Sequence, residues 1–181
     1  MCEIRDKNGL TEAEFLAEYN PDAYPKPALT ADICVIAKSE EGYELLLIKR
    51  GNHPYLGHWA LPGGFANKNE PAEETAAREL FEETGIEGIL LKLTGFYSAP
   101  GRDPRGWTVS AAYTAVIGKD SVKVQAGDDA ADAKWFKIRH EAGGIFLVNG
   151  ETVLPVTEGA RGTGKLAFDH THIISDALKI I

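Results

Sequence analysis

Residues 64–86 read GFANKNEPAEETAARELFEETGI. Between Glu70 and Glu83 this stretch carries six carboxylates in fourteen residues, and only Arg78 offsets them. In a helix, like charges three or four residues apart face each other, and each such pair costs a few tenths of a kcal/mol. We therefore expect something outside the chain to compensate the charge.

Three of these carboxylates have helical spacing. Glu79, Glu82 and Glu83 are separated by three and four residues, so a helix places them on one patch of surface. Clustered oxygen ligands of this kind suit Mg²⁺ or Mn²⁺. Gly63 and Gly64 come before the helix, and glycine lets the backbone approach a ligand closely. The pattern indicates a loop followed by a helix that binds a metal-bound phosphate.

A solvated acidic helix is the alternative, but the spacing of the fixed positions argues against it. The stretch matches the pattern G-x5-E-x7-R-E-U-x-E-E-x-G-U, where U is aliphatic. From background residue usage, such a match arises by chance on the order of once in 10⁹ starting points. The chain therefore resembles a Nudix hydrolase. The matching residues are Gly64, Glu70, Arg78, Glu79, Leu80, Glu82, Glu83, Gly85 and Ile86.

The resemblance implies an α/β Nudix fold, in which a mixed β-sheet is sandwiched between helices (α-β-α). The matching segment, residues 64–86, is called the box and would form a loop-helix-loop. The resemblance also implies that Glu79, Glu82 and Glu83 bind Mg²⁺ or Mn²⁺. The carbonyl of Gly63 would add a further ligand, and Arg78 would orient the carboxylates. A divalent ion there would bridge phosphate oxygens and lower the pKa of a bound water.

The resemblance leaves the general base open. In this family it is either a box glutamate or an acidic residue from a distant loop. Glu79 and Glu82 are the candidates in the box. The acidic residue from a distant loop would come from 127–132, GDDAAD, and Asp129 is our candidate for the general base there. For Asp128 and Asp129 a turn pair is an equally good interpretation.

A second segment, SAPGRDPRGW at 98–107, carries two arginines in a rigid loop. The guanidinium groups of Arg102 and Arg105 suit phosphate or carboxylate partners. In the alternative, these arginines pair with local acids such as Asp103 on the surface. The segment resembles the PGRDPRG stretch of Nudix domains linked to ADP-ribose and NAD metabolism, so we expect all three residues to bind substrate.

Aromatic and histidine residues lie close to the glycine loop in the sequence. Trp59 and Phe65 flank the loop and could stack an adenine, although aromatic residues at strand ends more often belong to the core. The histidines at 53, 58, 170 and 172 are interpreted as loop or packing residues.

The resemblance extends over roughly 27–138 and includes the later segment LAFDH at 166–170. It implies an ADP-ribose pyrophosphatase that forms AMP and ribose 5-phosphate. A pyrophosphohydrolase of nucleoside triphosphates, such as 8-oxo-dGTP, has the same box. The non-enzymatic alternative is a sensor related to NAD- or sugar-responsive regulators. Those regulators add a winged-helix domain and can lose box carboxylates. This sequence keeps the carboxylates and ends at Ile181, so we expect a hydrolase.

The composition is ordinary for a globular domain, with 181 residues, 44% apolar and 25% charged. A net charge of −8 without any basic run argues against a nucleic-acid partner. Two cysteines provide no disulfide framework, and no signal peptide or apolar stretch of ~20 residues is present. We expect a cytoplasmic protein without a membrane partner that acts on a small-molecule nucleotide and, like its ADP-ribose-type relatives, forms a homodimer.

Residues 1–27 are expected to form a helical extension with a Pro-rich linker, and residues 28–181 the Nudix hydrolase domain. Thr11 and Glu14 predict a capping box. Pro71 suits the first turn of the box helix and Gly85 its end. Asn149-Gly150 predicts a type I′ turn, Asp169 could cap the last helix, and 107–117 alternates apolar with more polar residues. Strands are expected at 28–37, 43–49, 58–61, 90–97, 107–117 and 133–138, a hairpin at 145–154, and helices at 11–19, 71–84 and 170–180.

Overall fold

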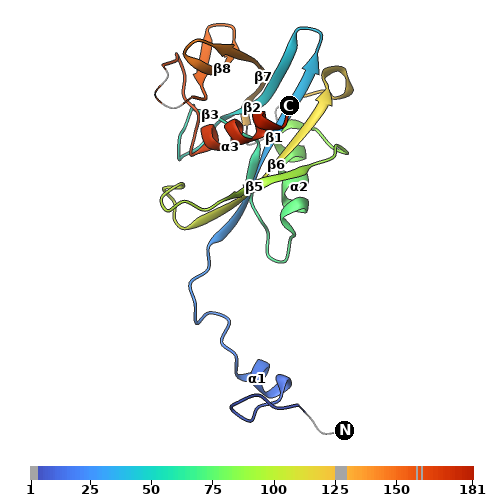
Figure 1. Ribbon diagram of the computed structural model, residues 1–181, viewed down its shortest axis with the longest axis vertical. Coiled ribbons are helices and arrows are strands. Elements are labelled where there is room, and N and C mark those ends of the chain that lie inside the picture. The colour runs from blue at the N-terminus through green and yellow to red at the C-terminus, as the bar shows by residue number, and fades with distance from the viewer. Residues whose placement is uncertain (1–3, 125–129, 158, 160) are drawn as a thin grey trace.

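The structure is a computed structural model that describes residues 4–124, 130–157, 159 and 161–181. In this part of the chain, nine strands form one sheet, with α2 (Ala72–Thr84) and α3 (His170–Ala177) packed against it (Figure 1). The expected α/β architecture is confirmed. The strands are β1 (Ala28–Ser39), β2 (Gly42–Arg50), β3 (Trp59–Ala60), β4 (Gly63–Phe65), β5 (Lys92–Tyr97), β6 (Thr108–Gly118), β7 (Ala130–Glu141), β8 (Gly144–Asn149) and β9 (Thr152–Pro155).

The central strand β1 brings distant parts of the sequence together. The strand order is β5-β6-β1-β2-β7-β8-β9, with β3 paired to β2 and β4 paired to β1. β1 runs parallel to β6 and antiparallel to β2 and β4, so the sheet is mixed as predicted. Asp32 on β1 is the register partner of Gly63 on β4. This pairing places the glycine loop beside the middle of the sheet.

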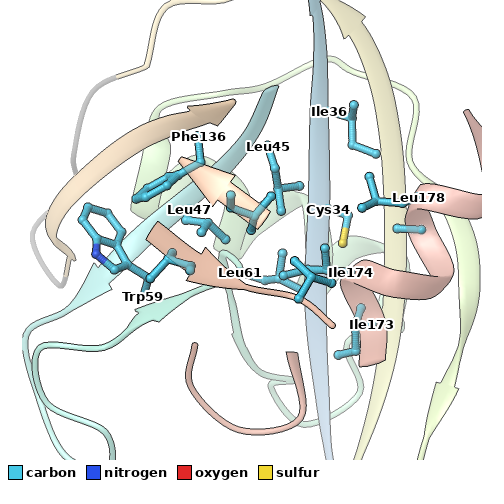
Figure 2. Close-up of a cluster of buried hydrophobic side chains, with 14 of the residues drawn as sticks. Cys34, Ile36, Leu45, Leu47, Trp59, Leu61, Phe136, Ile173, Ile174 and Leu178 are labelled. Atoms are coloured by element: carbon cyan, nitrogen blue, oxygen red, sulfur yellow. The ribbon is translucent and has the colours of Figure 1, made fainter. Parts of the chain in front are cut away.

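Each face of the sheet carries its own apolar layer. Successive residues of a strand point to opposite faces. Cys34 and Ile36 therefore pack with Ile173 and Ile174 of α3 (Figure 2), whereas Ile33 and its alternating neighbours pack against α2. Because helices cover both faces, β1 is buried along most of its length, which explains its continuous apolar sequence.

The box helix begins and ends close to the predicted residues. Pro71 is the N-cap of α2, one position before the predicted first turn. Gly85 ends the helix in the left-handed conformation, with φ of 71°, and its N–H donates to the carbonyl of Phe81 at 2.8 Å. Glycine adopts this conformation at little cost, so the predicted stop is confirmed.

The strand predicted at 107–117 is confirmed as β6, which is buried at Ser110 and Thr114 as well as at its apolar positions because both faces of this inner strand are covered. The turn predicted for the last hairpin is wrong. The turn between β8 and β9 is not type I′, since Asn149 pairs with Thr152 and Gly150 alone has a positive φ there. Glycine at the first central position is typical of type II′.

The last helix is shorter than predicted. α3 ends at Ala177 and continues as the 3₁₀ turn η2 (Leu178–Ile180). Asp169 occupies the N-cap position, but its side chain makes no capping hydrogen bond. Its carboxylate binds Arg102 instead.

The N-terminal segment lies apart from the sheet. Helix α1 (Glu12–Glu18) is separated from β1 by an extended stretch (Figure 1). The predicted capping box is confirmed, since Thr11 and Glu14 bond reciprocally. α1 contains no buried residue, and Phe15 and Leu16 are 45% and 61% exposed. Within the described residues, no helix has the length and apolar character needed to cross a membrane.

Candidate active site

Arg78 connects the box carboxylates to one another and to the glycine loop. Its guanidinium donates two hydrogen bonds to Glu70, at 2.8 and 2.9 Å, and one to the carbonyl of Phe65 at 3.0 Å. The same group contacts Glu79 at 2.7 Å and Glu82 at 3.0 Å. Arg78 keeps the pKa of Glu70 far below its ordinary value. Arg78 therefore joins Glu70, Glu79 and Glu82 in one network.

Two glutamates of α2 pack against the glycine loop. Glu83 accepts a hydrogen bond from the N–H of Gly63 at 2.8 Å. A Cβ atom on Gly64 would lie 2.5 Å from Cδ of Glu79, so the carboxylate occupies space that only glycine leaves free. The loop and the helix are therefore closely fitted at this point.

Burial makes both carboxylates unfavourable as anions. It raises the pKa of Glu83 to about 8, because the hydrogen bond from Gly63 only partly opposes burial and the charge of Glu79 adds to it. Burial also raises the pKa of Glu79, although Arg78 opposes this. A nearby cation would stabilise both anions.

The residues fit a divalent cation, but the three glutamates are not gathered as a finished cluster. The side chain of Glu82 is 54% exposed and turned to Arg78, whereas that of Glu79 is 14% exposed. No group of three His, Cys, Asp or Glu side chains in the described ranges is arranged to bind a metal. The two loop-facing carboxylates, Glu79 and Glu83, supply the oxygen ligands that Mg²⁺ and Mn²⁺ prefer.

A cleft separates the glycine loop from the loop at 98–107. Gly63 and Gly64 of the first loop line it together with Arg102, Asp103 and Arg105 of the second. A ligand in this cleft would thus contact both segments that the sequence singled out.

The two arginines of the 98–107 loop have different environments. The side chain of Arg102 is 4% exposed and binds Asp169 through two hydrogen bonds, at 2.9 and 2.7 Å. The side chain of Arg105 is 41% exposed, and its Cζ lies 4.5 Å from the ring centroid of Phe65. Arg105 can therefore face a ligand, whereas the donors of Arg102 are used inside the protein.

The remaining predicted substrate residues also divide by burial. Asp103 is 4% exposed and accepts hydrogen bonds from the backbone and guanidinium of Arg105. Trp59 packs edge-on against Phe136 with ring centroids 4.7 Å apart and belongs to the core (Figure 2). The core interpretation therefore holds for Trp59. Phe65 is 40% exposed next to the glycine loop, and the guanidinium of Arg105 lies over its ring.

The cleft is also lined by residues that the sequence did not indicate as part of the site, namely Thr30, Asp32, Arg50, Leu61, Phe168 and His170. The guanidinium of Arg50 lies 5.0 Å from the ring centroid of Phe168, and that of Arg105 lies 5.5 Å from the same centroid. Burial, together with the nearby charge of Arg105, lowers the pKa of Arg50. Asp32 lines the same cleft. The only feature of the sequence that indicated any of these residues is the LAFDH segment at 166–170, which contains Phe168 and His170. The predicted Asp129 lies outside the described residues.

Comparisons with known proteins agree with the fold and the box. Residues 26–152 match the NUDIX domain. The chain is 38% identical over 157 residues to the ADP-ribose pyrophosphatase of Methanocaldococcus jannaschii, a match that covers 86% of this chain and 76% of that enzyme.

Two other relatives are described by their response to, or complex with, the same ligand. The ADPR responsive transcriptional repressor NtrR of Acinetobacter baylyi is 38% identical over 112 residues, which span 61% of this chain and 45% of the repressor. The NUDIX domain of Shewanella oneidensis NrtR, solved in complex with ADP ribose, is 31% identical with a TM-score of 0.73. That match covers 94% of this chain and 99% of that domain.

Proposed function

Because this chain belongs to the Nudix hydrolase family, we propose that it is a metal-dependent ADP-ribose pyrophosphatase that forms AMP and ribose 5-phosphate. One observation carries the proposal: the glycine loop that packs on Glu79 and Glu83 opens into the same cleft as Arg105. The similarity to the M. jannaschii enzyme and to a domain complexed with ADP ribose supports this substrate.

In the proposed reaction, Glu79, Glu82 and Glu83 would hold Mg²⁺ or Mn²⁺ beside the glycine loop, with the carbonyl of Gly63 as a further ligand. The ion would supply positive charge that screens the pyrophosphate and would make water more acidic. The N–H of Gly63 orients Glu83, and Arg78 orients Glu79 and Glu82. The general base stays open between a box glutamate and Asp129.

In the same cleft, Arg105 provides a charge for the substrate phosphates. The guanidinium of Arg105 is held by a 2.7 Å hydrogen bond to the carboxylate of Asp103, so the Arg105 side chain loses little conformational entropy when a substrate binds. The exposed ring of Phe65 offers an apolar surface for the adenine.

The experiment that tests the proposal is hydrolysis with Mg²⁺ or Mn²⁺ across a small panel, with the products identified by chromatography. The panel contains ADP-ribose, NADH, 8-oxo-dGTP, the ordinary dNTPs and a dinucleoside polyphosphate. Preference for ADP-ribose supports the assignment. Preference for a triphosphate keeps the metal site and refutes the substrate, and equal turnover without added metal refutes metal dependence.

The second candidate is a ligand sensor without turnover, which the match to the A. baylyi repressor favours. The complete set of Glu79, Glu82 and Glu83 supports the hydrolase over this candidate. Calorimetry distinguishes the two, because a sensor binds ADP-ribose tightly in the presence of Mg²⁺ and leaves it intact.

The proposal includes a homodimer in the cytoplasm without a nucleic-acid partner, in which residues 28–181 form the catalytic domain and residues 1–27 an arm. The exposed Phe15 and Leu16 of α1 and the exposed Phe96 of the edge strand β5 are apolar surfaces that a second copy could cover. The buried free thiol of Cys34 suits a reducing compartment. Light scattering of the whole chain tests the dimer.

A further inference from the structure

One wall of the cleft contains a buried polar network to which the proposed reaction assigns no role. Asp32 of β1 is 8% exposed, and His170 at the start of α3 is 3% exposed. Asp32 accepts a hydrogen bond from Ser110 and lies 3.5 Å from Arg102 and 3.4 Å from Nε2 of His170. Buried polar groups are retained where their partners are fixed, so this network constrains the segments that contribute to it.

The contacts of His170 assign its protonation state. The backbone N–H of Leu61 donates to Nδ1 of His170 at 2.9 Å. A ring nitrogen that accepts a hydrogen bond carries no proton, so the ring is neutral and its proton lies on Nε2. Nε2 in turn faces the carboxylate of Asp32. Both ring nitrogens are therefore oriented.

The hydrogen bond to Leu61 acts on the glycine loop. Leu61 is separated from Gly63 only by Pro62, and the N–H of Gly63 holds the carboxylate of Glu83. Gly63 is also the register partner of Asp32. His170 thus contacts the segment that presents Glu83 directly through Leu61 and indirectly through Asp32.

Asp169, the residue before His170, links the start of α3 to the loop at 98–107. Asp169 binds Arg102 through two hydrogen bonds, and Arg102 belongs to the loop that carries Arg105. The start of α3 therefore connects the loop with the glutamates to the loop with the arginine. His170 makes the first of these connections directly, and it reaches Arg102 only through Asp32.

We propose that His170, as its neutral Nε2–H tautomer, is a positioning residue that sets the glycine loop, and with it Glu83, for metal binding and pyrophosphate cleavage. The inference rests on the proposed hydrolase function. Because the two hydrogen bonds between Arg102 and Asp169 do not involve His170, loss of His170 affects kcat and the requirement for metal more than the KM for ADP-ribose.

Three substitutions separate the two contacts of the ring. His170→Asn keeps an acceptor near the position of Nδ1, for the N–H of Leu61, but does not reach Asp32. His170→Gln reaches Asp32 but has no acceptor at the position of Nδ1. His170→Ala loses both contacts. We expect His170→Ala and His170→Gln to lower kcat by at least ~10-fold, and to weaken Mn²⁺ binding by a similar factor, since a shift of about 1 Å in a site is costly. His170→Asn should restore most of both. Ile173→Val, in the buried face of the same helix, is the matched control and should change only thermal stability.

Two results would overturn the inference. One is wild-type kcat and Mn²⁺ affinity in folded His170→Ala or His170→Gln protein. The other is a proton on Nδ1, seen in ¹⁵N spectra of the imidazole rings of the whole protein without substrate. Calorimetric Mn²⁺ titration and the spectra need no turnover. If the panel of substrates shows no hydrolysis, the proposed function fails while the role of His170 in the metal site is still decided.

Discussion

Replacing Gly64 with alanine should displace the carboxylate of Glu79 and lower the rate of hydrolysis without destabilising the fold. The new Cβ would lie 2.5 Å from Cδ of Glu79 and 2.5 and 2.6 Å from its oxygens. Ordinary contact needs roughly 3.5 Å, so the carboxylate must retreat by about 1 Å. A displacement of this size costs on the order of 10²-fold in rate. Gly64 lies outside the left-handed region, so alanine itself is not strained there.

The assay for Gly64→Ala is kcat/KM for ADP-ribose at saturating Mg²⁺, together with thermal unfolding. Gly143→Ala is the control, because its Cβ would meet the ring of Phe146 at an ordinary 3.5 Å and should change neither quantity. Gly63→Ala should instead destabilise the fold, since Gly63 has φ of 152° and its Cβ would lie 2.1 Å from the backbone oxygen of Ala31. A value of kcat/KM for Gly64→Ala within about 3-fold of the wild type would refute the reasoning.

Four further substitutions test the environments of single residues. Arg102→Ala should cost about 3–5 kcal/mol in urea unfolding, because it leaves Asp169 and Asp32 without their buried partner; a cost below about 1 kcal/mol would contradict this. Arg105→Ala should raise the KM for ADP-ribose roughly 10-fold, the effect of losing one hydrogen bond to a charged group, and should also lower stability because it leaves the buried Asp103 without its partner; an unchanged KM would exclude Arg105 from the substrate site. Glu83→Gln should lower kcat by at least ~10²-fold with the fold intact, and near-normal turnover would remove Glu83 from the metal site. For Asp103, burial would raise the pKa, but the hydrogen bonds from Arg105 outweigh burial and lower it. The stability that Asp103 contributes is therefore complete above its ordinary pKa of about 3.9 and is lost as the pH falls through the lowered value. The stability difference between wild type and Asp103→Asn, from urea unfolding at several pH values, should shrink only in acid, and a difference that grows as the pH falls would show the opposite shift.

The box helix was predictable because the interactions that define it are local. Glu79, Glu82 and Glu83 follow a helical period, and Gly85 has the conformation that ends a helix. The contact between Arg78 and Glu82 also spans one helical turn. The sequence contains all of this information within a few residues.

The environments of Arg102 and Arg105 were not predictable, although both belong to one short loop. Arg102 is buried because Asp169, which is 67 residues away in the sequence, lies beside it in the fold. The acceptor for the N–H of Leu61 is likewise 109 residues away, on His170. Such long-range partners depend on how the sheet and α3 pack, which no local pattern contains.

The parallel pairing of β1 with β6 has a consequence for how the protein folds. The paired residues are 80 positions apart along the chain, as in Ala28 with Thr108, whereas the hairpin of β1 and β2 closes through a short turn. Closing the long loop between β1 and β6 costs more chain entropy than closing the short turn between β1 and β2. We therefore expect the hairpin to form early and the parallel pairing late. Asp32, at the centre of the polar network, meets Ser110 only in that late step. A refolding chain therefore regains the hairpin of β1 and β2 before it completes its sheet and regains a competent cleft.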